Sequence, residues 1–144
     1  MQMPEGFSVS TVEVDTPLLN RRQLSSLLDQ LDLSADVKAI LQDLAEITVT
    51  VGKRVLQIGR KIIEVALALF RAFANVIFGA IIASVLVMVI SGVPALGALL
   101  ANFVEPILLA VGIGQGALAE IQSGTLGERI DAFVQTLNEA IGVQ

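Results

Sequence analysis

Residues 72–119 read AFANVIFGAIIASVLVMVISGVPALGALLANFVEPILLAVGIGQGALA, and Glu105 is the only charged residue among them. A bilayer core about 30 Å thick takes about 20 helical residues, whereas the charge-free run Ala72–Val104 would measure about 50 Å as one helix. Ser91-Gly92-Val93-Pro94 interrupts it, because Gly relaxes the backbone and Pro disfavours helix at the residue before it. The sequence therefore predicts a two-span transmembrane helical hairpin, with spans at about 70–91 and 96–118. Its turn either reaches the far surface or stops inside the bilayer as a re-entrant wedge.

Composition supports a membrane protein and excludes several kinds of chemistry. The 144 residues are 54% hydrophobic and 16% charged, against about 45–50% and about 25% in soluble domains. The absence of Cys and His removes disulfides, thiol chemistry and His-based catalysis. No nucleophile–base pair, phosphate-binding glycine loop or metal cluster is visible, so we expect no enzyme, no cofactor and no metal. The net charge of −5 argues against nucleic acid as a partner.

Four regions follow from the pattern: an extended N-terminal arm (1–15), an amphipathic helical region (16–69), the transmembrane hairpin (70–118) and a C-terminal amphipathic helix (119–144). In the arm, Phe7 and Val9 alternate with Ser, and Val12 and Val14 alternate with acids. Such alternation is typical of a strand, but its phase changes between Val9 and Val12, so the arm does not read as one continuous strand. The arm is either a flexible tail or a segment that pairs with a neighbouring subunit.

The amphipathic region reads as helices. Thr16 is a good N-cap, followed by Pro at the first helical position, and Ser34 caps the next helix. Apolar residues then recur at three- and four-residue steps from 37 to 65. This pattern predicts one long helix, or two with a kink near Gly52. The β-branched run 47–51 also fits a strand.

Basic residues precede and flank the first span. They are Lys53, Arg54, Arg60, Lys61 and Arg71. Cations in such places attract anionic headgroups and hold their side of the segment in the cytoplasm. The alternative is an ordinary solvated helix face. With a hairpin in the membrane, both termini are then expected on the cytoplasmic side. Arg71 is expected to pair with Glu120 near the membrane base.

Small residues fall on shared helix faces within the hairpin. They are Gly79, Ala83, Gly97, Ala101, Gly112 and Gly116, the last two forming a GxxxG pair. Faces of this kind let helix backbones approach closely in lipid. They indicate either packing of the hairpin on itself or self-association.

Three polar residues lie inside the predicted spans: Asn75, Ser84 and Glu105. A charged carboxylate in mid-span costs about 2.5–3.5 kcal/mol on insertion scales. Counted from the turn, Glu105 is level with Ala83 and Ser84. We therefore expect Glu105 to face protein as a neutral carboxyl, with a proton site, an ion site or a pore-lining ring as the alternative.

The sequence as a whole predicts an all-α, integral membrane protein that is a structural or accessory subunit. Its expected partners are the lipid bilayer and either further copies of itself or a larger membrane complex. The alternatives are a pore-forming, holin-like or ion-conducting oligomer using Glu105 and Asn75, and a soluble protein whose hairpin stays buried in a helical shell until release. The layout of amphipathic helix, hairpin and amphipathic helix is similar to thylakoid curvature proteins and to the hydrophobic hairpin of pore-forming colicins. That likeness is one of architecture, with no shared motif.

Overall fold

The computed structural model describes residues 20–31, 33–73, 76–112, 121 and 123–142. Their elements, in chain order, are α1 (Arg21–Gln30), α2 (Ala35–Leu44), β1 (Val49–Val51), β2 (Arg54–Leu56), α3 (Ile58–Ala72), α4 (Phe78–Gly92), the 3₁₀ helix η2 (Pro94–Leu96), α5 (Gly97–Val111) and α7 (Thr125–Gly142). The mainly helical class predicted from the sequence is confirmed. The β1–β2 hairpin is an addition to it.

Both N-terminal helices begin at side-chain caps. The Asn20 side chain accepts from the Gln23 amide at 2.8 Å, and the Gln23 side chain accepts from the Asn20 amide at 3.0 Å, which is a reciprocal capping box. The backbone of Asn20 is extended and caps α1, which begins at Arg21, whereas the predicted helix start at Thr16 and Pro17 lies outside the described residues. Ser34 caps α2 as predicted, its hydroxyl accepting from the Val37 amide at 3.2 Å.

The long helix predicted across residues 37–65 is wrong. α2 ends at Leu44, and an antiparallel hairpin follows in which Val51 pairs with Arg54 across a two-residue loop. Gly52 takes a φ of +63° in this loop, as the first central residue of a tight hairpin turn often does. The β-branched run that also fitted a strand therefore folds as one, since its alternation suits a half-buried ribbon.

The predicted break in the hydrophobic stretch is present, but both helices beside it are shorter than expected. α4 begins only at Phe78, after α3 has ended at Ala72. α5 ends at Val111 because Gly112 adopts a left-handed conformation as its C-cap. Among the described residues no single helix is long and apolar enough to span a membrane. Phe78–Gly92 and Pro94–Ala110 pass that test only together, as a pair bent by 116°.

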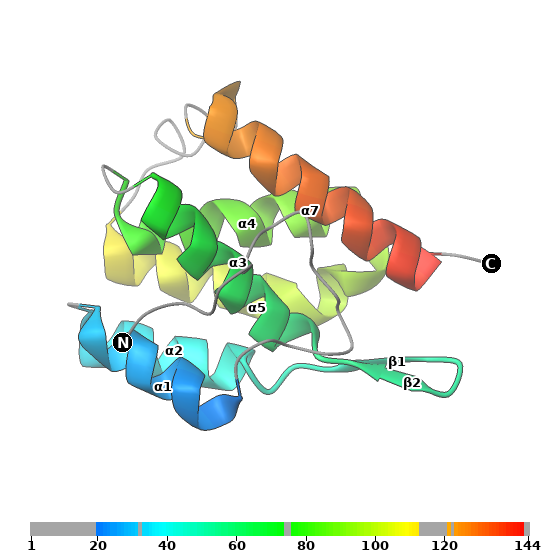
Figure 1. Ribbon diagram of the computed structural model, residues 1–144, viewed down its shortest axis with the longest axis horizontal. Coiled ribbons are helices and arrows are strands. Elements are labelled where there is room, and N and C mark those ends of the chain that lie inside the picture. Colours follow the sequence, from blue (N-terminus) through cyan, green and yellow to red (C-terminus); the bar gives the residue numbers. More distant parts are fainter. Residues whose placement is uncertain (1–19, 32, 74–75, 113–120, 122, 143–144) are drawn as a thin grey trace.

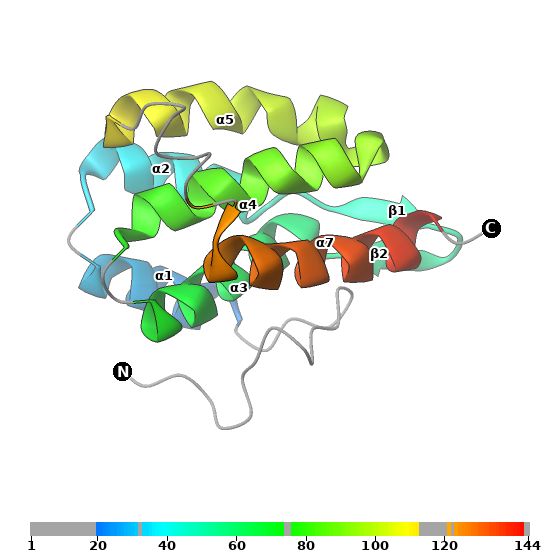
Figure 2. The ribbon, with the colours of Figure 1, turned by 90° about the horizontal axis from the view of Figure 1, so that it is seen from above.

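α4 runs through the middle of the molecule, and α3, α5 and α7 pack around it (Figure 1). Its first nine residues, 78–86, are all buried, as expected of a helix that is apolar on every side. α7 places its apolar stripe against this core, with Ile130, Phe133 and Leu137 fully buried. α5 forms one outer edge of the molecule, beside α2 (Figure 2).

Close packing requires two glycines, Gly59, which the sequence analysis did not single out, and Gly92, which it placed in the helix break. A Cβ at Gly59 would overlap the backbone oxygen of Leu44, and a Cβ at Gly92 would overlap the side chain of Val134. Gly59 lets α3 start directly against the end of α2, where its amide donates to Ile47 at 3.0 Å. Gly92 lets α7 cross the end of α4.

Candidate membrane-facing surface

α5 has two contrasting faces. Its inner face is built on Leu100 and Ile107, both fully buried. Its outer face, which we call the α5 outer face, consists of the exposed residues Ala98, Leu99, Ala101, Asn102, Glu105, Pro106, Leu109 and Ala110. The exposed positions recur in pairs about one helical turn apart, so they form a continuous stripe. Only two of the eight side chains are polar.

The two leucines give the α5 outer face most of its apolar area. Leu109 is 74% exposed and Leu99 is 40% exposed. A shallow groove continues this surface onto α2, where Asp36, Ala39 and Ile40 lie beside Pro106, Leu109 and Ala110. The groove therefore joins two helices far apart in sequence into one largely apolar surface, and Asp36 is the only acidic residue among the described residues that line the groove.

Glu105 lies on this outer face and is exposed. It was expected to face protein, and the structure contradicts that expectation. Counting residues from the turn gives the position of Glu105 along the helix axis, but it does not determine on which side of the helix its side chain lies. Glu105 follows the buried Leu100 by five residues, which places it about 140° around the helix from the core. Ser84, its expected partner, is fully buried, and among the described residues its hydroxyl has no hydrogen-bond partner.

Pro106 sits inside α5 on the same face. Because proline has no N–H, the carbonyl of Asn102 loses its usual helical hydrogen-bond donor. Both residues are exposed, so this carbonyl lies on the side of the helix that faces away from the core. The α5 outer face therefore carries a backbone acceptor, an amide and a carboxylate along an otherwise apolar surface.

The structure separates the predicted small-residue face into parts with different surroundings. Gly79 and Ala83 are buried inside the molecule, whereas Ala101 and Gly112 are exposed. Gly97 is half-buried, and a Cβ there would meet Ile90 at an ordinary 3.8 Å. A Cβ at Gly112 would meet nothing within 4 Å, since this glycine serves as a helix cap. Its GxxxG partner, Gly116, lies outside the described residues.

The predicted basic cluster is dispersed as well. Lys53 is exposed in the β1–β2 loop, Arg54 lies in β2, and Arg71 is exposed at the far end of α3. Arg60 is half-buried, and among the described residues its Nε has no hydrogen-bond partner. Its neighbour in sequence, Lys61, is 1% exposed.

Lys61 was expected at a membrane surface, and its burial contradicts that expectation. Its Nζ lies 3.3 Å from Oε1 of Glu64, whose side chain is fully buried. Sequence reasoning missed Glu64. The available signal was its spacing of three residues from Lys61, within a segment between Ile58 and Val65 in which Arg60 is the only other charged residue.

Several expectations fall on residues that the structure leaves undescribed, among them the N-terminal arm (1–15). Asn75 lies outside the described residues, and so does Glu120, the expected partner of Arg71. One described contact beside Asn75 is a cation–π pair, in which the Arg129 guanidinium lies 5.5 Å from the ring centre of Phe73. It links the end of α3 to the first turns of α7.

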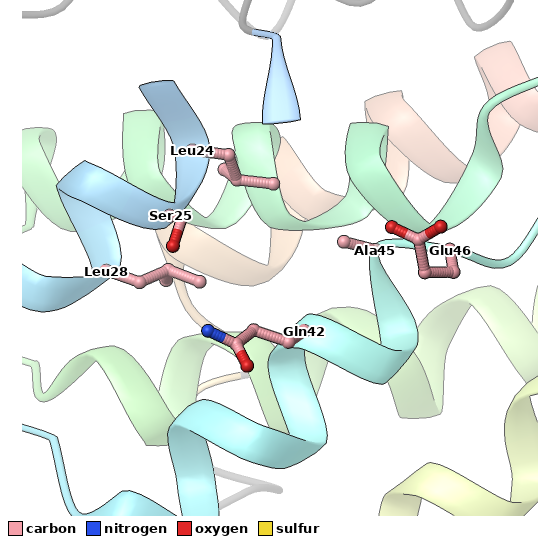
Figure 3. Close-up of a pocket in the computed structure, with 6 residues that line it drawn as sticks. All are labelled: Leu24, Ser25, Leu28, Gln42, Ala45 and Glu46. Atoms are coloured by element: carbon pink, nitrogen blue, oxygen red, sulfur yellow. The ribbon is translucent and has the colours of Figure 1, made fainter. Parts of the chain in front are cut away.

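A separate hollow of about 190 Å³ lies between α1 and α2. Its floor is apolar, and Figure 3 shows the Gln42 amide extending from α2 toward the side of α1 that carries Ser25 and Leu28. Glu46 stands at the other end, beyond Ala45. A hydroxyl, an amide and one carboxylate form no nucleophile–base arrangement of the usual kinds.

Within the described ranges, no three Asp or Glu side chains gather as a metal site would need. Among the described surfaces, the α5 outer face stands out because six of its eight exposed side chains are apolar. Comparisons of the chain with protein-family models, curated proteins and solved structures found no match.

Proposed function

We propose that this chain is a structural or accessory membrane subunit that binds a lipid bilayer through its α4–α5 hairpin and assembles with further copies or within a larger membrane complex. The supporting observation is the α5 outer face, which is apolar apart from Asn102 and Glu105. Solvent-facing helix surfaces usually carry charges. An apolar stripe left exposed is typical of a surface that contacts a membrane or a partner.

With α4 buried as it is in this structure, we expect bilayer binding through the α5 outer face alone to be weak and reversible. Fully burying a leucine stabilises a complex by about 1.5–3 kcal/mol, and Leu109 and Leu99 are only partly available for it, at 74% and 40% exposure. The alanines add little area. Stable association therefore requires either several copies acting together or release of the buried helix α4.

The lengths of the two helices favour a shallow mode of insertion. α4 and α5 each have 15 residues, which gives about 22 Å per helix, less than the core thickness of about 30 Å. Their bend of 116° suits a wedge that enters one leaflet and returns. This mode keeps both ends of the hairpin on one side, in agreement with the expectation of cytoplasmic termini.

Vesicle flotation of the full chain tests the proposal. We expect the protein to rise with phosphatidylcholine vesicles, and Leu109→Glu to reduce the bound fraction. Val55→Glu is the matched control, because Val55 is an exposed apolar residue, at 49%, on the β1–β2 hairpin. A parent chain that never floats, or two variants that lose binding equally, would contradict binding through α5.

The exposed position of Glu105 on an apolar helix face favours a second candidate, an oligomeric pore. Helices that associate through such a face would bring several carboxylates around one axis. Dye release from loaded vesicles separates the two functions. Binding without release supports the accessory subunit, whereas release that Glu105→Gln abolishes supports the pore.

A further inference from the structure

The charged residues beside the groove between α2 and α5 are acidic. Asp36 lines the groove, and Glu105 precedes Pro106 on the exposed side of α5. Asp43 follows Asp36 at two helical turns and is also exposed, so it continues the same side of α2. Helix α5 itself contains no Lys or Arg. The apolar surface is therefore bordered by carboxylates from both helices.

The lysine of α2 lies on another side of that helix. Lys38 follows Asp36 by two residues, which places it about 160° around the helix from Asp36. Its Nζ lies 3.7 Å from Oδ1 of Asp29 in α1, so the ion pair holds this cation toward α1. Helix α2 thus presents its lysine to α1 and its exposed acids near α5.

We propose that the α5 outer face and this groove bind bilayers of zwitterionic phospholipids and disfavour anionic ones, an inference that rests on the proposed function and names its lipid class. Phosphatidylcholine and phosphatidylethanolamine carry an ammonium group at the outer end of the headgroup, where it can meet a carboxylate of the protein. An anionic leaflet attracts Lys and Arg and, by the same physics, repels Asp36 and Glu105. The basic residues that favoured anionic headgroups in the sequence are dispersed in the structure.

The shape of this surface favours a bilayer over a protein partner. Leu109 is 74% exposed on α5, which forms an outer edge of the molecule (Figure 2). A side chain that stands out from such an edge enters fluid acyl chains without a matching pocket, whereas a protein partner must supply a hollow of complementary shape. The groove beside Leu109 is shallow and lined partly by Ala39 and Ala110. It offers little depth for the large anchor side chains on which protein interfaces depend.

Flotation of the full chain tests the proposal, with vesicles of phosphatidylcholine and with vesicles of equal parts phosphatidylcholine and phosphatidylglycerol. The variant Asp36→Asn/Glu105→Gln removes two carboxylates from the proposed surface. Its matched control is Glu128→Gln/Glu139→Gln, because both residues are exposed on α7 and Glu128 lies in the first turn of its helix, as Asp36 does. α7 packs on α4 away from α5 (Figures 1 and 2). Both variants raise the net charge of −5 by two, so a difference between them reports where the charges lie.

We expect the parent to partition onto phosphatidylcholine vesicles about tenfold more strongly than onto the mixed vesicles. The Asp36/Glu105 variant should reduce this ratio to about threefold or less, and the α7 control should keep the ratio of the parent. Circular dichroism checks that each variant keeps the helical fold.

Equal ratios in the two variants would show that only the total charge matters, and a parent that prefers the mixed vesicles would reverse the assigned lipid class. Either result overturns this inference and leaves bilayer binding through α5 standing. A parent chain that floats with neither kind of vesicle overturns the proposed function as well. Binding of a helical peptide of leucine and lysine to such a chain would assign the surface to a basic protein partner.

Discussion

Nζ of Lys61 lies 3.3 Å from Oε1 of Glu64, one turn along α3, and their side chains are 2% and 0% exposed. Removing two charges from water is costly, and their attraction repays that cost only when both are present. Ile62 and Ile63, which lie between them in the same helix, are also fully buried. The cost of burying each charge therefore depends on the presence of the other.

Removing one member of this pair should destabilise the fold strongly. Lys61→Met leaves the Glu64 carboxylate in the interior without its lysine, and we expect it to lower the free energy of unfolding by about 3–5 kcal/mol. The double variant Lys61→Met/Glu64→Leu should lose less than the single variant, since it removes both buried charges. Urea unfolding followed by circular dichroism measures the difference. A single variant as stable as the parent would show that the pair is solvated.

Gly59 should tolerate no side chain, whereas Gly97 should accept one. Gly59→Ala forces a methyl group onto the backbone oxygen of Leu44, and overpacking of this kind costs about 1–3 kcal/mol or more. Gly97→Ala is the control, because its Cβ would make only an ordinary contact at 3.8 Å. Because Gly97 is the first residue of α5, alanine there should raise stability by less than the about 0.5–1 kcal/mol that it gains over glycine in the middle of a helix. Thermal unfolding of both variants checks the contrast, and a Gly97→Ala variant that melts earlier than Gly59→Ala would contradict it.

Local signals predicted the ends of several elements. The Ser34 cap and the break at Ser91–Pro94 each depend on residues adjacent in sequence, so reading the sequence was enough. The stretch 47–56 misled the interpretation because Val51 and Val55 fit a helical stripe and a hairpin equally well. The choice between them was made by Gly52, whose positive φ suits a tight turn and not a helix.

Whether a helical side chain faces the core or solvent depends on which other helices pack against it, and the local sequence does not show that packing directly. Lys61 follows Arg60 in a basic run, yet the packing of α3 buries one and leaves the other half-exposed. Counting from the turn assigned Glu105 a level along α5 but not a face, whereas the face of α5 that meets the core is the one that carries the buried Leu100 and Ile107. Which face of a helix becomes buried depends on how the side chains of the two helices pack together over their whole contact surface.

Ser84 provides a direct test of whether Glu105 turns inward. In the structure its hydroxyl is buried, and among the described residues it has no hydrogen-bond partner. An unpaired buried hydroxyl costs about 1–3 kcal/mol, so Ser84→Ala should leave the free energy of unfolding unchanged or raise it by about 1 kcal/mol. A loss of more than about 1 kcal/mol would mean that the hydroxyl is bonded, with Glu105 as the partner expected from its level.

Reversing the charge of Glu105 should change binding to membranes and leave the fold intact. Glu105 is exposed on α5, and substitutions at such places usually change stability by less than about 0.5 kcal/mol. Glu105→Lys removes one negative charge from the proposed bilayer-facing surface and adds one positive charge, and each cation near an anionic bilayer contributes about 1 kcal/mol. The bound fraction on phosphatidylglycerol-containing vesicles should therefore rise, more than on neutral vesicles, and fall again with added salt because salt screens exposed charges. Glu105→Gln should lie between the parent and Glu105→Lys in the same flotation assay. If Glu105→Lys unfolds the protein, the carboxyl faces the interior, and if the variant binds both kinds of vesicle as the parent does, the α5 outer face lies away from the bilayer.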